Sequence, residues 1–198
     1  MNVKTLVLGS YGTTCYIIWP ENGSKCLVID PGYEPDTVLD AVDDLGLTIE
    51  AILLTHGHFD HVGGVRQIAA DTDCRVFLNT ADCSMPPMMP DGQLYYTDSY
   101  AGGEELELAG LKIGVIATPG HTPGSVCLMC EKNIFSGDTL FAGSCGRTDL
   151  PGGNTAQIRK SLALLNTLEG NYFVYPGHGP SSSLSEEKRH NPYLGGRL

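Results

Sequence analysis

Residues 55–64 have the sequence THGHFDHVGG, which places three histidines and one aspartate within six positions. An apolar run, AILLT, leads into this stretch and has the length of a short buried strand. Side chains alternate along an extended segment, so we expect His56 and His58 to point in the same direction. Asp60 and His61 follow the turn, where they can aim at a neighbouring point. The stretch therefore has the composition of a metal site at the end of a strand.

Three more candidate ligands follow predicted strands further along the chain: His121 in TPGHTPGS, Asp138 in FSGDTL and His178 in YPGHGP. Imidazole and carboxylate groups suit zinc, iron and manganese. One histidine at a strand end is usually a surface or hydrogen-bonded residue, but seven candidate ligands in such positions indicate a metal site. Structural zinc sites are commonly rich in cysteine and use four ligands. Seven ligands without a thiol instead indicate two metals with open coordination positions.

Hydrophobic patterning predicts strands and helices around these motifs. The expected strands lie within residues 3–8, 14–19, 25–30, 51–55, 75–78, 106–118, 125–137 and 172–175. The expected helices are residues 35–45, 61–70, 155–169 and 185–191. Residues 81–103 have the composition of a loop, in which Met85, Met88 and Met89 either line a substrate entrance or pack locally. Strands followed by helices in two blocks suggest a two-layered β core with helices outside, in an α/β or α+β architecture.

Composition and charge restrict the class of protein. A length of 198 residues favours one domain spanning residues 1–198. Twelve basic and 23 acidic residues give a net charge of −11, which disfavours nucleic acid and anionic membranes as partners. No apolar run approaches the roughly 20 residues of a membrane span, and polar and glycine residues interrupt the amino terminus where a signal peptide would be apolar. Seven scattered cysteines fit a reducing compartment, so we expect a cytoplasmic protein.

One pair of cysteines has the spacing of a redox or zinc motif. Cys127 and Cys130 form a C-x-x-C, but they lie in VCLMC, which has the pattern of a strand. Residues three apart on a strand point to opposite faces. We therefore expect buried structural thiols here.

The motifs together resemble those of the metallo-β-lactamase superfamily. THGHFDHVGG resembles its H-x-H-x-D-H signature, and TPGHTPGS, FSGDTLF and YPGHGP resemble its later metal motifs in the same order. The likeness begins with VIDPG at residues 28–32 and covers nearly the whole chain. It implies an α+β fold, a four-layer αββα sandwich with the metal site at one edge of the β sandwich.

The resemblance also implies a division of the ligands between two divalent metals, zinc in the first instance with iron or manganese as alternatives. One metal would take His56, His58 and His121. The second would take Asp60, His61 and His178, with Asp138 bridging the two and Asp60 serving in catalysis as well.

Within the superfamily, the sequence is most similar to glyoxalase II and its short relatives. The segment GRTDLPGG at 146–153 resembles these proteins and also the iron-dependent persulfide dioxygenases. The resemblance implies that a metal-bridging hydroxide cleaves a small acyl thioester, as in hydroxyacylglutathione hydrolase. Persulfide dioxygenation and lactone hydrolysis are the alternatives. Pro-Gly-His-Gly at 176–179, where the dioxygenases typically have Pro-Ala-His-Asp, favours hydrolysis.

Substrate recognition and two individual residues leave alternatives open. Long glyoxalase II proteins carry a further helical domain that helps to hold glutathione, and about twenty residues follow His178 here, so we expect weaker selectivity for glutathione. Arg147 either binds a substrate carboxylate or pairs with Asp149. Asp30 either orients a ligand histidine or caps the adjacent turn. The sequence does not determine the oligomeric state.

Overall fold

Two six-stranded sheets form the centre of the chain, in a computed structural model that describes residues 1–86 and 93–194. The strands are β1 (Asn2–Leu8), β2 (Thr13–Trp19), β3 (Lys25–Ile29), β4 (Thr48–Leu53), β5 (Arg75–Leu78), β6 (Asp98–Ser99), β7 (Glu105–Leu108), β8 (Leu111–Ala117), β9 (Val126–Cys130), β10 (Asn133–Gly137), β11 (Leu140–Phe141), β12 (Ser144–Cys145), β13 (Phe173–Pro176) and β14 (Ser182–Ser183). The helices are α1 (Pro35–Asp44), α2 (Phe59–Val62), α3 (Val65–Thr72), α4 (Thr155–Thr167) and α5 (Leu184–His190), with a 3-10 turn η1 (Thr80–Ser84).

Both sheets mix parallel and antiparallel pairing. The first has the order β1-β2-β3-β4-β5-β6, antiparallel from β1 to β3 and parallel from β3 to β6. The second has the order β14-β13-β10-β9-β8-β7, in which β10 and β13 are parallel and the other neighbours antiparallel. The parallel strands of each sheet therefore end at a shared edge.

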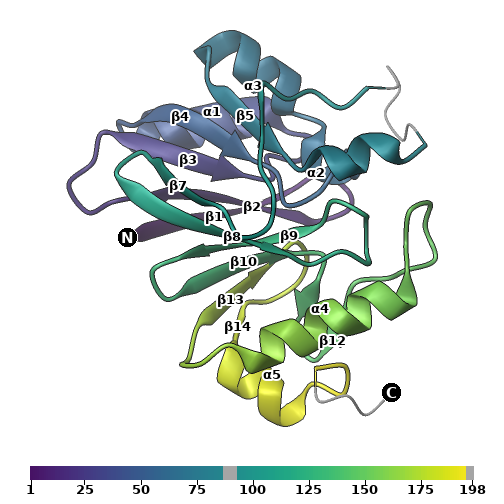
Figure 1. The fold of residues 1–198 in the computed structure, drawn as a ribbon. Helices are drawn as coiled ribbons and strands as arrows, with labels where there is room; N and C mark the ends of the chain where they lie inside the picture. The colour runs from purple at the N-terminus through teal and green to yellow at the C-terminus, as the bar shows by residue number, and fades with distance from the viewer. Residues whose placement is uncertain (87–92, 195–198) are drawn as a thin grey trace.

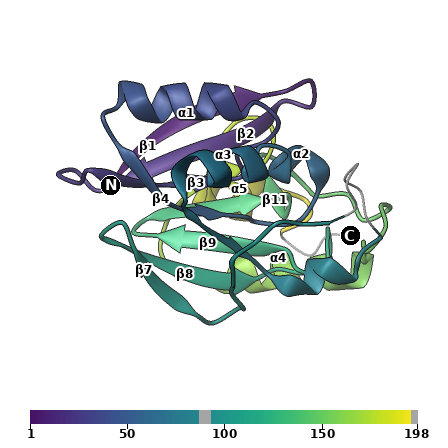
Figure 2. The ribbon, with the colours of Figure 1, turned by 90° about the horizontal axis from the view of Figure 1, so that it is seen from above.

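Alternating side chains build a core on each side of the first sheet. On β2, Cys15 and Ile17 pack toward α1 and α3, whereas Tyr16 and Ile18 pack between the sheets. Helices α1 and α3 cover the outer face of the first sheet, and α4 and α5 lie on the far side of the second (Figure 1). In the view turned by 90°, α1 and α3 lie over the first sheet (Figure 2). This arrangement confirms the αββα sandwich.

The helix expected over residues 61–70 is wrong: the chain forms α2 and α3, separated by Gly63 and Gly64. A Cβ at Gly63 would lie 2.5 Å from the ring of Tyr33, and one at Gly64 would lie 3.1 Å from the carbonyl oxygen of Gly32. The break thus brings this backbone against the loop that follows β3. This contact fixes where α2, which carries Asp60 and His61, ends.

The loop expected over residues 81–103 also contains regular structure, because η1 extends into it and β6 joins the first sheet. Met85 lies close to Gly152, where an added Cβ would be 2.9 Å from the Met85 sulfur. Met88 and Met89 lie outside the described residues. No helix of the described residues is long and apolar enough to cross a membrane.

The cysteines are free, and all seven lie in the described part of the chain. Cys127 packs against α4 and Cys130 packs between the sheets, as expected for opposite faces of β9. Burial raises the pKa of each thiol to about 11. The pair therefore has the environment of structural thiols.

Helix α4 offers a matched test of the core that backs the second sheet. Leu162 is 1% exposed and packs with Ile134 and Val174, whereas Leu164 on the same helix is 46% exposed. We expect Leu162→Ala to lower the free energy of unfolding by about 2–5 kcal/mol, because it leaves a cavity. Leu164→Ala should change it by less than about 0.5 kcal/mol. Urea unfolding of both variants in excess chelator measures the difference, and equal losses would contradict the packing described here.

Candidate metal centre

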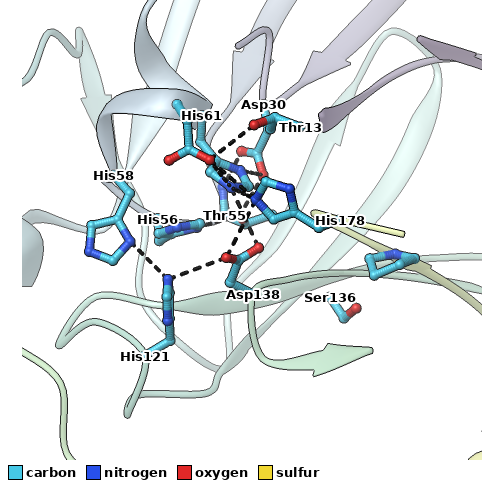
Figure 3. Close-up of polar contacts among 12 residues, drawn as sticks. Thr13, Asp30, Thr55, His56, His58, His61, His121, Ser136, Asp138 and His178 are labelled. Carbon is cyan, nitrogen blue, oxygen red and sulfur yellow. Dashed lines mark hydrogen bonds and ion pairs between the residues drawn. The ribbon is translucent and has the colours of Figure 1, made fainter. Parts of the chain in front are cut away.

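The seven candidate ligands converge at the edge where the parallel strands end. Figure 3 labels six of them, and the seventh, Asp60, lies 3.2 Å from Nε2 of His178. They come from the segment after β4 (His56, His58), from α2 (Asp60, His61), from the loop after β8 (His121), from the residue after β10 (Asp138) and from the segment after β13 (His178). Segments far apart in the sequence thus deliver their side chains to one place, because each strand ends at the same edge.

His56, His58 and His121 form the first set, in which one ring nitrogen from each lies within 4.8 Å of the others. Nδ1 of His58 is 2.8 Å from Nε2 of His121. Nδ1 of His121 lies 2.8 Å from the backbone carbonyl oxygen of Arg147. A carbonyl only accepts, so this nitrogen carries the proton and Nε2 presents its lone pair to the set.

Asp60, His61 and His178 form the second set, again with ligand atoms within 4.8 Å of one another. Nε2 of His61 is 3.4 Å from Nε2 of His178, which is 3.2 Å from Oδ2 of Asp60. The hydroxyl of Thr13 donates to the same Asp60 oxygen at 3.0 Å. Burial opposes ionisation of Asp60, but His178, His61 and Thr13 hold its pKa well below its ordinary value. Asp60 is therefore a carboxylate anion at neutral pH.

Asp138 lies between the two sets. Its Oδ1 is 3.4 Å from Nε2 of His61, and its Oδ2 is 3.4 Å from Nε2 of His121 and 3.7 Å from Nε2 of His178. Burial opposes its ionisation, yet the three histidines keep its pKa below the ordinary value. One carboxylate thus has an oxygen directed to each set.

Three buried atoms of the cluster have no hydrogen-bond partner among the described residues: Nε2 of His56, Nε2 of His58 and Oδ1 of Asp138. Unpartnered buried polar atoms are costly, and a bound cation would satisfy them. Burial and the neighbouring histidines lower the pKa of His56 well below its usual value and that of His58 to about 4, so both imidazoles are neutral and can bind metal. The donor set therefore fits divalent metal ions.

Asp30 orients two of the histidines from behind. Its Oδ1 accepts from the backbone amide of Thr55 at 2.8 Å, and its Oδ2 accepts from the Thr55 hydroxyl at 2.6 Å and from Nδ1 of His61 at 2.9 Å. The Thr55 hydroxyl also lies 3.0 Å from Nδ1 of His56. Because its hydrogen is used in the bond to Asp30, the hydroxyl oxygen acts as the acceptor for that nitrogen. These contacts occupy Nδ1 of both histidines and turn each Nε2 toward the centre, so the structure favours the orienting role for Asp30 over turn capping.

Asp30, His56 and His61 also come close enough to count as a third possible metal group. Both oxygens of Asp30 are already occupied by hydrogen bonds from Thr55 and His61. The two sets that share Asp138 are therefore the better description of the centre.

A cavity of about 510 Å³ opens above the centre. The ligands His58, Asp60, His121, Asp138 and His178 line it, and its other lining residues are Tyr11, Phe59, Phe141, Ser144, Cys145, Arg147 and Leu150. Tyr11 and Phe59 meet edge to face with ring centroids 5.1 Å apart. The sequence analysis missed this aromatic wall, although Phe59 lies inside the ligand motif and Tyr11 lies in the turn between β1 and β2.

Both alternatives for Arg147 are compatible with its position. It lines the cavity, and its guanidinium makes two hydrogen bonds of 2.7 Å to the carboxylate of Asp149. The ion pair is exposed to solvent. Arg147 thus stands at the wall of the cavity in a pairing that an anionic ligand would have to share or replace.

The fold and the His/Asp centre define a metal-dependent hydrolase, and comparison with known proteins gives its family. Residues 8–178 match the family model of the metallo-beta-lactamase superfamily, and the chain belongs to that superfamily. Hydroxyacylglutathione hydrolase GloC of Haemophilus influenzae is 31% identical over 98% of both chains.

Two solved structures share the fold at similar identity. The crystal structure of BLEG-1 B3 metallo-beta-lactamase has a TM-score of 0.89 and 30% identity, covering 98% of this chain and 100% of that one. The crystal structure of TTHA1623 in a di-iron-bound form has a TM-score of 0.85 and 35% identity, covering 96% of this chain and 100% of that one. The chain is thus similar along its length to proteins whose names include a hydrolase, a β-lactamase and a di-iron protein.

Asp30→Asn tests how this carboxylate supports the centre. Asp30 has a φ of +49°, which asparagine tolerates, so the backbone is not the variable. In the variant, the side-chain amide nitrogen replaces one of the two carboxylate oxygens. It then faces either the backbone amide of Thr55, or the Thr55 hydroxyl together with His61, so an acceptor is lost in both cases. We expect metal affinity to fall by about 10- to 100-fold, measured by competition with a chelator. Asp40→Asn, an exposed position on α1, is the control. Unchanged affinity in Asp30→Asn would contradict the orienting role.

Proposed function

We propose that the chain is a binuclear metal-dependent thioesterase that cleaves small acyl thioesters in the manner of hydroxyacylglutathione hydrolases. The observation that carries this proposal is the position of Asp138, which is shared by two ligand sets at the base of a substrate-sized cavity. The similarity to GloC of Haemophilus influenzae supports the substrate class. We further propose a small-molecule substrate, since the net charge of −11 disfavours nucleic acid. We propose a cytoplasmic location because the seven cysteines are free, which fits a reducing compartment.

In this proposal His56, His58 and His121 hold one metal. Asp60, His61 and His178 would hold the other, and Asp138, whose oxygens lie near histidines of both sets, would serve both. A bound pair of divalent metals supplies a hydroxide nucleophile at neutral pH and polarises the substrate carbonyl. We propose zinc, with iron and manganese as alternatives; the di-iron form of TTHA1623 supports a pair of metals and the iron alternative.

The residues of the chain perform the remaining tasks. Thr13 holds one oxygen of the Asp60 carboxylate. Asp60 would accept a hydrogen bond from the attacking water and so orient it at the second set. Tyr11, Phe59 and Phe141 give the acyl group an apolar wall and restrict water. A thiolate is a good leaving group, so this reaction needs no strong acid from the protein.

Three other reactions fit the same ligands and are separated by one assay panel. Lactone hydrolysis uses the same attack on an ester carbonyl, persulfide dioxygenation uses iron and oxygen, and the name of BLEG-1 adds β-lactam hydrolysis. Metal analysis of the native protein, with turnover measured on a thioester, a lactone, glutathione persulfide and a β-lactam, distinguishes them. We expect about two metals per chain and the highest kcat/KM on the thioester. Oxygen consumption on the persulfide without thioester turnover would overturn the proposal.

Asp60→Asn tests the role of this carboxylate in catalysis. The amide keeps the shape of the side chain but loses the negative charge that holds the second metal and orients the nucleophile. We expect kcat to fall about a hundredfold and the second metal to be held more weakly. Steady-state kinetics and elemental analysis of metal-replete protein measure both effects. Wild-type turnover with unchanged metal content would show that the second set is not catalytic.

Arg147→Ala tests recognition of the thiol half of the substrate. We expect the wild type to prefer lactoylglutathione over a lactoyl thioester of a small uncharged thiol only modestly. The variant should raise KM for the glutathione ester by about fivefold at most, because the ion pair is exposed. Arg189→Ala, whose partner is Glu186 on α5, is the control. A preference of several hundredfold that Arg147→Ala abolishes would instead reveal a dedicated glutathione site.

A further inference from the structure

Asp82 is a buried carboxylate outside the two ligand sets. It lies in η1, after β5, and is 1% exposed. Nothing in the surrounding sequence marks it as functional. Its neighbours in space, however, are the two loops that carry His56, His58 and His121.

Three donors from these loops converge on the Asp82 carboxylate. Its Oδ2 accepts from the backbone amide of Gly57 at 2.7 Å and from the hydroxyl of Thr122 at 3.0 Å. Its Oδ1 accepts from the backbone amide of Gly124 at 2.5 Å. Burial raises the pKa of Asp82, and the three donors counteract that shift. Since each oxygen faces an amide N–H, the arrangement suits the ionised carboxylate.

Two of the three donors are adjacent in sequence to residues of the first ligand set, and the third, Gly124, lies three residues after His121. Gly57 lies between His56 and His58, and Thr122 immediately follows His121. One carboxylate therefore bridges the segment after β4 and the loop after β8. Within the described residues, no hydrogen bond joins Asp82 to the second set.

The contact is close enough to exclude side chains at the glycines. A Cβ at Gly57 would lie 3.2 Å from Cβ of Asp82 and 2.7 Å from Leu94, and one at Gly124 would lie 2.7 Å from Cγ of Asp82. At the opposite end of the bridge, Thr122 is held by Ser125, whose hydroxyl is 2.7 Å from its own. The Asp82 carboxylate is thus in direct contact with the backbone of both loops and separates one loop from the other.

We infer that Asp82 is a positioning residue that sets the spacing of His56, His58 and His121 and thereby the metal affinity of the first set. This inference rests on the metal assignment of the proposed function and not on the thioester substrate. A purely structural role would weaken the fold, whereas a positioning role weakens one set selectively.

Asp82→Asn tests the inference because it keeps the shape of the side chain. Its amide nitrogen must face the N–H of Gly57 or that of Gly124, so one donor loses its acceptor. We expect this loss to lower metal affinity in the first set by about 10- to 100-fold. The second set should keep its affinity within about threefold.

Cobalt(II) binding to metal-free protein, followed by visible absorbance, reads the two sets separately in two backgrounds. His178→Ala disables the second set and leaves the first, and His121→Ala does the reverse. We expect Asp82→Asn to weaken cobalt binding in the His178→Ala background and not in the His121→Ala background. Asp98→Asn, which disturbs the exposed pair with Arg75, is the matched control and should change neither.

Thr122→Val provides a milder variant that removes one donor while keeping the volume of the side chain. It should weaken cobalt binding in the same background by a smaller factor, and it decides the matter if Asp82→Asn fails to fold. The positioning role would be overturned if the variants bind cobalt as tightly as their parent backgrounds, or if cobalt affinity falls equally in both backgrounds. Absence of cobalt binding in both parent backgrounds would instead overturn the metal assignment itself.

Discussion

The carboxylate of Asp30 joins the ends of two parallel strands to the helix that carries two of the three residues of the second ligand set. It follows β3 directly, accepts two hydrogen bonds from Thr55 after β4, and accepts a third from His61 in α2. Because the group is 1% exposed, losing any of these donors would leave a buried charge poorly compensated. The orientation of the His56 and His61 rings, and hence of the Nε2 atoms that face the centre, depends on this single group.

The sequence is sufficient to predict the layers of the fold and the members of the centre, for two different reasons. Continuous apolar runs such as Cys15–Ile18 indicate strands buried on both faces, which requires cover on both sides of the sheet. Histidines and aspartates directly after such strands lie at a sheet edge once the strands are parallel. The convergence of His56, Asp138 and His178 therefore follows from local patterns and topology.

What the sequence does not predict depends on contacts between distant segments. The apolar positions Val62, Val65 and Ala69 continue a helical pattern across Gly63 and Gly64, and the break arises from packing against the loop after β3. Asp82 meets its partners 25, 40 and 42 residues away, from a segment with no periodic pattern. Sequence patterns report local preferences, so Asp82 is missed, whereas Asp30, which lies in the VIDPG motif, is named as a candidate orienting residue.

The pairing of the chain's early and late segments at the centre also constrains how the protein can fold. Thr13 forms an isolated bridge with His178, and the amide of Thr14 donates to the carbonyl of Gly177 at 2.7 Å. In the folded state, His178 follows β13, which pairs in parallel with β10 across the α4 connection. Thr13 and His178 are 165 positions apart, so completing the second ligand set requires closure of a long loop, which is entropically costly. During synthesis on the ribosome, the residues of the first set would emerge before the segment that completes the second set.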